Sequence, residues 1–107
     1  MKSLIRSGRL AEDIKKNTSE FIARESNYSS LITVTRVILN DSLKSAQILI
    51  TVYPEDKKDE VLDFLKRQRT NIRDYLMKKI RSRIIPFIDF FNDEGEKNRQ
   101  RLDELSQ

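Results

Sequence analysis

The side chains of this chain that are able to carry chemistry are charged groups rather than nucleophiles. Its 107 residues include no cysteine and no histidine, which excludes disulfides, thiolate metal sites and the usual Ser-His and Cys-His catalytic arrangements. The carboxylate pairs Asp59–Glu60 and Asp103–Glu104 lie in charged helical runs, and we interpret them as surface charge rather than as acid–base pairs. We therefore expect neither enzymatic turnover nor a bound cofactor or metal.

Positive charge is concentrated in one segment. Between Lys66 and Arg83 the chain carries eight basic residues and one acid, a net charge of +7, although the whole chain carries only +4. Both flanks, residues 53–65 and 89–107, carry a net charge of −3. A local excess of this size favours a partner rich in phosphate. The alternative is a solvated basic helix face without a partner, and charge alone does not separate the two.

The elements that position these charges follow from the spacing of apolar residues. Between Arg9 and Arg24 the apolar residues recur at helical intervals. Residues 31–39 are rich in β-branched side chains, and residues 46–52 alternate between an apolar face and a mixed face. Because a polar turn at residues 40–42 separates these two runs, they predict an antiparallel hairpin.

Two helical stripes come next. Pro54 stops the second strand, and together with the acids behind it opens a helix whose buried side is formed by residues 61–65. A second stripe runs from Ile72 to Ile80. Residues 67–71 are predicted either to continue the helix or to break it, with Asn71 in the left-handed conformation that asparagine tolerates.

The last strand is the most hydrophobic segment of the chain. Pro86 is predicted to end the basic helix and to begin a strand. Apolar side chains occur on both faces of this strand. This pattern predicts that both faces of the strand are at least partly covered. We expect Tyr28 and Tyr53 at exposed element ends, and the remaining aromatic residues of the second half in the core: Phe64, Tyr75, Phe87, Phe90 and Phe91.

The predicted order is helix-strand-strand-helix-helix-strand. It indicates an α+β fold in which a three-stranded sheet carries the helices on one face. Residues 1–92 are expected to form this single domain, and residues 93–107 a charged tail that forms at most a short helix. No window approaches the roughly 18 apolar residues of a membrane span, and the N-terminus is too short and polar for a secretory signal. A cytoplasmic protein without a membrane partner is expected.

The element order resembles that of a type II KH domain, which is an RNA-binding fold. The residues resemble the ribosome-binding factor A family of bacterial small-subunit assembly factors, through "RLAEDIKKNTSEFIARE" (9–25), "LITVTRVILNDSLKSAQILITV" (31–52) and "IRDYLMKKIRSRIIPFIDFFND" (72–93). The third stretch is the most specific: as in the family, a basic helix, Arg-x-Arg, two apolar residues and proline precede a strand ending in Phe-Phe and an aspartate. The family's Ala-x-Gly kink is replaced by residues 69–71, and its C-terminal glycine, near Arg99, is missing.

The resemblance implies a monomeric assembly factor that binds the free or immature small (30S) ribosomal subunit and its rRNA. It would assist maturation and processing of that rRNA as a non-catalytic chaperone, without a cofactor or small-molecule substrate. The residues expected to contact RNA lie on the basic helix and at the kink: Arg67, Arg69, Asn71, Arg73, Lys78, Lys79, Arg81 and Arg83.

On a helical projection Lys78 and Arg81 point away from the core, whereas Arg73 and Lys79 flank the apolar stripe. Because few aromatic residues are expected to be free, recognition of folded RNA by its shape and backbone is favoured over stacking on single-stranded bases. Two alternatives remain open. One is a general KH-type RNA-binding protein unrelated to ribosomes, and the other is a protein-interaction module whose basic helix meets an acidic partner.

Overall fold

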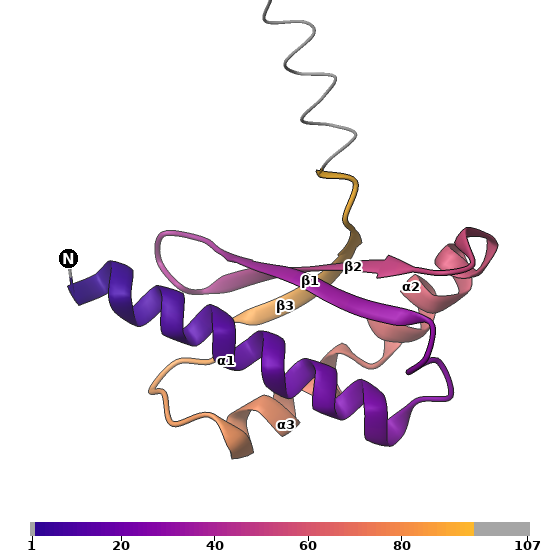
Figure 1. Cartoon of the computed structure of the whole chain (residues 1–107). Coiled ribbons are helices and arrows are strands. Elements are labelled where there is room, and N and C mark those ends of the chain that lie inside the picture. Colours follow the sequence, from indigo (N-terminus) through magenta and orange to yellow (C-terminus); the bar gives the residue numbers. More distant parts are fainter. Residues whose placement is uncertain (1, 96–107) are drawn as a thin grey trace, which may run out of the picture.

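The chain folds in the predicted order, with one short 3₁₀ helix added. A computed structural model describes residues 2–95, and for residues 2–7 the backbone alone. Its elements are drawn in Figure 1: α1 (Lys2–Glu25), β1 (Ile32–Leu39), β2 (Ser45–Val52), η1 (Glu55–Lys57), α2 (Lys58–Arg67), α3 (Arg69–Lys79) and β3 (Phe87–Asn92). The predicted tail lies outside the described residues from position 96 onward.

The three strands form one sheet in the order β1-β2-β3. β1 and β2 pair antiparallel, with Ile32 opposite Val52, which confirms the predicted hairpin. β3 pairs parallel with β2, as expected for two strands joined by a helical crossover. The register of β1 shifts between Val34 and Arg36, so that Thr35 forms a β-bulge.

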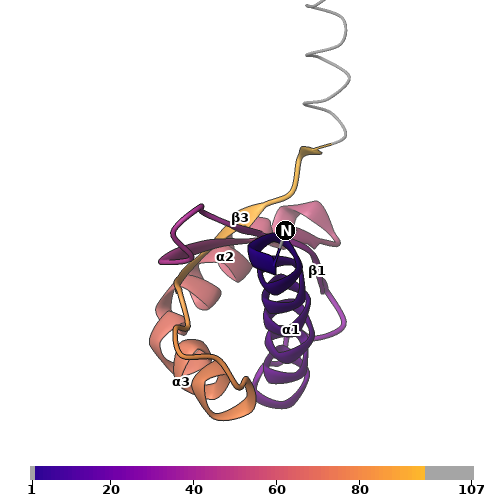
Figure 2. The same ribbon diagram turned by 90° about the vertical axis from the view of Figure 1, so that its left-hand side faces the viewer.

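The helices all lie on one face of the sheet, as the α+β prediction requires. Figures 1 and 2 show α1 beneath the hairpin, with α2 and α3 on the same side beneath β3. The core fills the space between them, with Ile48 of β2, Ile14 of α1 and Leu76 of α3 fully buried. Each such side chain contributes about 1.5–3 kcal/mol by its removal from water.

The junction between α2 and α3 lies at Gln68. Its backbone has φ −92° and ψ 5°, and its N–H group donates to the carbonyl oxygens of Phe64 and Leu65 at 3.1 and 3.0 Å. Of the two alternatives that the sequence leaves open, the structure shows the break rather than a continuous helix, but a left-handed Asn71 is wrong, because Asn71 lies inside α3. Among the described non-glycine residues only Leu43 has a positive φ. Gln68 thus lies in the bridge region of the φ/ψ map, which residues other than glycine can adopt.

The last strand departs from the prediction in two ways. α3 ends at Lys79 rather than at Pro86, and an irregular segment, residues 80–86, leads to β3. β3 is an edge strand with helices on one face only, so Ile88 and Phe90 are buried while Phe87 is 68% and Phe91 41% exposed. The prediction that Phe87 and Phe91 belong to the core is therefore wrong. The second face of the strand is covered only in part, as the half-buried Asp89 shows.

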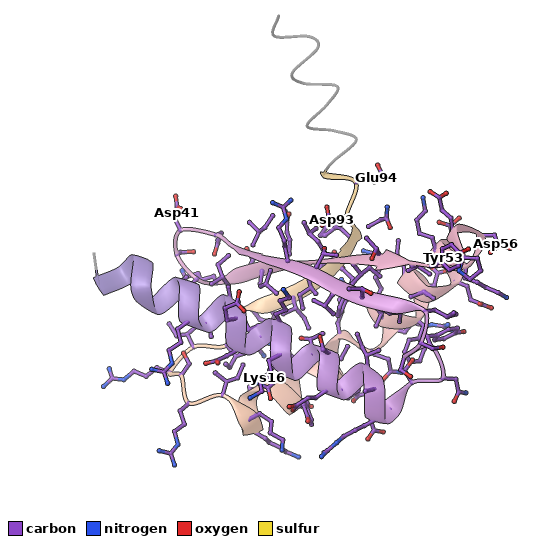
Figure 3. All side chains as sticks on the ribbon, viewed as in Figure 1. Lys16, Asp41, Tyr53, Asp56, Asp93 and Glu94 are labelled. Atoms are coloured by element: carbon purple, nitrogen blue, oxygen red, sulfur yellow. The ribbon has the colours of Figure 1, made fainter. Side chains whose placement is uncertain are left out.

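The chain stays bound to the sheet beyond the predicted domain boundary at residue 92. The N–H group of Asp93 donates to the carbonyl oxygen of Ile50 at 2.6 Å. Its Oδ2 accepts a hydrogen bond from the hydroxyl group of Thr35 at 2.5 Å, and Arg36 Nε lies 3.9 Å from the same oxygen. Figure 3 places Asp93 and Glu94 beside the sheet, away from α3. Within residues 2–95 no helix is long and apolar enough to cross a membrane.

Candidate nucleic-acid interface

The eight predicted residues form two groups along α3. The junction group lies at the α2–α3 break and in the first half of α3, and consists of Arg67, Arg69, Asn71 and Arg73. The helix-end group lies at the C-terminal end of α3 and in the segment that leads to β3, and consists of Lys78, Lys79, Arg81 and Arg83. α3 has 11 residues and is therefore about 16 Å long at the helical rise per residue. Positive charge thus follows the whole helix.

The helix-end group consists of exposed cations. Within residues 8–95, the side chains of Lys78, Arg81 and Arg83 form no hydrogen bond, ion pair or ring contact. Lys79 is exposed too, with Nζ 5.5 Å from the centre of the Tyr75 ring. Arg81 and Arg83 were expected on a helix but lie on the irregular segment, in which Ile80 and Ile85 are buried. The segment is anchored at both ends while its arginines face water.

The junction group is partly occupied by contacts inside the protein. Arg67 Nε lies 3.4 Å from the Asp63 carbonyl oxygen, Arg69 Nε donates to the Lys66 carbonyl oxygen at 2.9 Å, and the Asn71 amide donates to the Gln68 side chain at 2.9 Å. Arg67, Arg69 and Asn71 are nevertheless exposed. Only Arg73 is half-buried, because its guanidinium donates to the carbonyl oxygens of Ile85 and Pro86 at 2.9 and 3.3 Å. Arg73 therefore fastens α3 to the start of β3.

Three cations of the helix pair meet the outward-facing residues of β3. Arg73 Cζ lies 4.4 Å from the centre of the Phe87 ring. Lys66 Nζ lies 2.9 Å and Arg69 Nη1 3.3 Å from Oδ1 of Asp89. Lys66 Nζ is also 4.9 Å from the centre of the Phe91 ring. Residues 87, 89 and 91 share one side of the strand because side chains alternate along it, and the helix pair supplies a cation to each.

The ion pairs of Asp89 set its protonation. Burial of the carboxyl group favours the neutral form, but hydrogen bonds from Lys66 and from the Phe90 N–H group, with the charges of Lys66 and Arg69, outweigh it. Together these interactions hold the pKa of Asp89 below its ordinary value of 3.8. Asp89 is therefore a carboxylate at neutral pH and neutralises part of the junction charge.

Two open grooves adjoin this row of cations. One, of about 380 Å³, separates α3 from β3 and is lined by Arg69, Thr70, Arg73, Asp74, Phe87 and Ile88. The other, of about 440 Å³, lies at the end of α2 and is lined by Asp63, Lys66, Arg67 and Arg69. Arg69 borders both grooves. The geometry suits an extended anionic ligand that passes the helix junction, because its cations lie at an open surface rather than around an enclosed cavity.

Sequence reasoning missed Lys66 and Phe87 as members of this surface. The sequence places Lys66 in the basic segment but gives no sign that it belongs to the contact surface, and its pattern predicts Phe87 in the core. No local pattern marks either residue, since both roles depend on β3 lying at the edge of the sheet. Within the described part of the chain, no three side chains of the metal-ligating types gather into a group. The surface offers cations and the exposed ring of Phe87.

The chain is similar to known proteins over most of its length. Residues 6–106 match the sequence model of the ribosome-binding factor A family. Ribosome-binding factor A of Buchnera aphidicola subsp. Schizaphis graminum is 33% identical over 96 residues, which cover 84% of this chain and 77% of that protein.

Solved structures give the same likeness. The crystal structure of ribosome-binding factor A from Thermus thermophilus superposes with a TM-score of 0.70 at 23% identity, covering 79% of this chain and 93% of that one. A homology model of the Thermus thermophilus protein, fitted into a cryo-EM map of its complex with the 30S subunit, superposes with a TM-score of 0.62 at 22% identity. It covers 74% of this chain and 86% of that one.

Proposed function

Since the chain belongs to the ribosome-binding factor A family, we propose that it binds the free or immature small ribosomal subunit through the subunit's rRNA. The helix-end group and the exposed members of the junction group form the contact surface. The complex of the Thermus thermophilus relative with the 30S subunit supports the choice of partner. A cytoplasmic location follows from that partner.

The observation that carries this proposal is the state of the helix-end cations. Lys78, Arg81 and Arg83 are exposed, and within residues 8–95 no acidic side chain neutralises them. Cations of this kind are available to phosphate because no internal acid competes for them, and their binding releases counterions from the nucleic acid. An acidic protein partner would also satisfy the charges, but the family membership favours RNA.

Binding to folded RNA needs the cations at fixed spacing. Ile72 and Leu76 are fully buried beneath α3, and Arg73 holds the helix against the start of β3. Phosphate contacts position a protein on RNA, and a rigid row of cations fits one curved backbone better than another. We propose that the protein assists rRNA maturation in this way, as a monomeric binding chaperone without turnover chemistry.

Sedimentation through a ribosome gradient tests the proposal. We expect the protein to migrate with free small subunits and to be scarce in assembled ribosomes. Equal affinity for unrelated structured RNAs, without enrichment on small subunits, would favour a general RNA-binding protein instead. Binding to naked rRNA fragments should weaken steeply with salt, because counterion release scales with the phosphates neutralised. Binding to an acidic protein with no affinity for rRNA would contradict the proposal.

A further inference from the structure

We propose that Phe87 is a stacking platform for one unpaired RNA base, with the guanidinium of Arg73 supporting the ring from its other face. This inference rests on the proposed function, because it assumes that the ligand is RNA. It adds a class of ligand: RNA in which at least one nucleotide is out of the helical stack. A surface of cations alone would bind a fully paired helix equally well.

The ring of Phe87 is exposed but held in place. Phe87 is 68% exposed, yet its N–H group donates to the carbonyl oxygen of Lys44 at 2.9 Å, which fixes the backbone at the start of β3. Arg73 Cζ lies 4.4 Å from the ring centre, a distance typical of a cation on an aromatic face. Arg73 is fixed in turn by the carbonyl oxygens of Ile85 and Pro86. One face of the ring is thus covered by a guanidinium, and the high exposure leaves the other face to solvent.

The groove beside Phe87 offers groups that complement a nucleotide. Its volume of about 380 Å³ lies near the lower end of the roughly 300–1,000 Å³ of small-ligand sites. The exposed residues Thr70 and Asp74 line it. A hydroxyl group and a carboxylate accept hydrogen bonds from the amino groups of bases. Arg69, which borders the same groove and pairs with Asp89, adds positive charge for a phosphate. Flat apolar surface next to hydrogen-bond acceptors and cations matches the three parts of a nucleotide.

Phe87 is distinguished from the other exposed aromatic residues by its surroundings. Phe91 is 41% exposed, and the ammonium above its ring is already bound to Asp89. Tyr53 is 82% exposed but is followed by Glu55 and Asp56, which would repel a phosphate backbone. Among the described residues, Phe87 is the exposed ring that lies against an arginine in a groove lined by a second arginine, Arg69.

The test uses the absence of tryptophan from the chain. Phe87→Trp introduces a single indole, and Tyr53→Trp places the same probe at the acidic end of η1 as a matched control. Each variant is titrated with an RNA hairpin that carries one bulged adenine and with the same hairpin fully paired. We expect the bulged hairpin to quench the fluorescence of Phe87→Trp but not of Tyr53→Trp, because stacking brings the base onto the indole.

Affinity supplies the second readout. Phe87→Leu should weaken binding of the bulged hairpin by about 5- to 150-fold, the range for one stacked base, and leave the paired hairpin unaffected. Phe87→Tyr should restore the affinity, since it keeps the aromatic face. Thermal melting followed by circular dichroism shows whether Phe87→Leu folds. If it does not fold, the fluorescence quenching of Phe87→Trp alone decides whether a base stacks at this position.

Three results would overturn the inference, and they separate it from the proposed function. If both hairpins bind but the fluorescence of Phe87→Trp is not quenched, Phe87 is not a stacking platform. The same follows if Phe87→Leu loses equal affinity for the two hairpins. Either result would leave the proposed function intact. A Phe87→Leu variant that loses small-subunit binding but keeps its RNA affinity would assign Phe87 to a protein partner. No binding of either hairpin, or of small-subunit rRNA, by the unaltered chain would remove both proposals.

Discussion

Lys66 Nζ lies 2.9 Å from Oδ1 of Asp89, so the last turn of α2 is fastened to the outward-facing side of the edge strand β3. The same oxygen lies 3.3 Å from Arg69 Nη1, on the far side of the helix junction. One carboxylate therefore holds both helices of the pair against β3. The groove in which Arg73 contacts Phe87 lies beside these ion pairs. Asp89 therefore helps to fix the positions of the residues that line it.

The stability of the protein should decrease in acid partly through Asp89. Because its pKa is lowered in the folded state, its contribution is present above the ordinary pKa, about 3.9 in the unfolded chain, and is lost as the pH falls through the folded pKa. The free energy of unfolding should thus fall less between pH 6 and pH 3 in Asp89→Asn than in the unaltered chain. Urea unfolding at both pH values measures this. Asp56 is an exposed acid outside any ion pair among the described residues. In Asp56→Asn the free energy of unfolding should decrease between pH 6 and pH 3 by as much as in the unaltered chain.

Charge reversal at the helix-end group should impair binding without unfolding the protein. Lys78→Glu with Arg81→Glu removes two exposed cations, and exposed substitutions change the free energy of unfolding by about 0.5 kcal/mol or less each. We expect weaker binding to small subunits and a shallower salt dependence, since each lost phosphate contact reduces the slope by about one. The melting temperature should stay within a few degrees. Lys16→Glu with Arg24→Glu on α1 makes the same charge change and should leave binding much less affected; equal effects of the two pairs would refute the assignment of the surface.

Phe90 and Phe91 are neighbours in sequence with opposite energetic roles. Phe90 is fully buried and Phe91 is 41% exposed. Phe90→Ala should lower the free energy of unfolding by about 3–5 kcal/mol, because it removes apolar contacts and leaves a cavity. Phe91→Ala should cost much less. Denaturant titrations of the two variants compare them directly, and similar losses would mean that β3 is covered on both faces after all.

Among the described residues, Thr18 has a buried hydroxyl group without a hydrogen-bond partner. It is fully buried in α1, and its Oγ1 has no hydrogen-bond partner among the described residues. Thr18→Val keeps the shape and removes the desolvation penalty, so we expect the free energy of unfolding to rise by about 1 kcal/mol. Thr35→Val should act in the opposite direction, because the Thr35 hydroxyl donates to Asp93 and contacts the Leu49 carbonyl oxygen. Differential scanning calorimetry of both variants provides the comparison; destabilisation by Thr18→Val would contradict the expectation.

Glycine at the helix junction should be unfavourable. Gln68 has φ −92° and ψ 5°, a conformation open to any residue. Gln68→Gly would increase the conformational entropy of the unfolded chain, which lowers the free energy of unfolding by about 0.4–1 kcal/mol. It would also remove the side-chain oxygen that accepts a hydrogen bond from the exposed Asn71 amide. Urea unfolding measures the change. A gain in stability would instead reveal backbone strain at Gln68.

The sequence predicted what depends on local pattern. The element order and the hairpin follow from periodicities that neighbouring residues create, and the structure confirms them. The sequence leaves open whether the chain breaks between the two helices, and the structure shows a break at Gln68. Family membership was identified from the same stretches and is confirmed by the family match. The roles of the eight contact residues stay predictions.

What the sequence did not predict depends on position in the sheet. An apolar run such as residues 84–91 looks the same in a central strand and in an edge strand, so the exposure of Phe87 could not be foreseen. Arg73 was expected to reach for phosphate, yet it donates to two carbonyl oxygens of the connecting segment. These hydrogen bonds join residues 12 and 13 positions apart, and no periodicity in the sequence predicts them.

The bulge at Thr35 has a consequence for the protein's behaviour in a crowded solution. β1 is the outermost strand on its side of the sheet, where unpaired main-chain groups would normally be a template for another chain to join. The bulge interrupts that template between Val34 and Arg36 and puts a charged side chain next to the interruption. The bulge therefore makes in-register extension of the sheet by a second molecule less favourable at this edge.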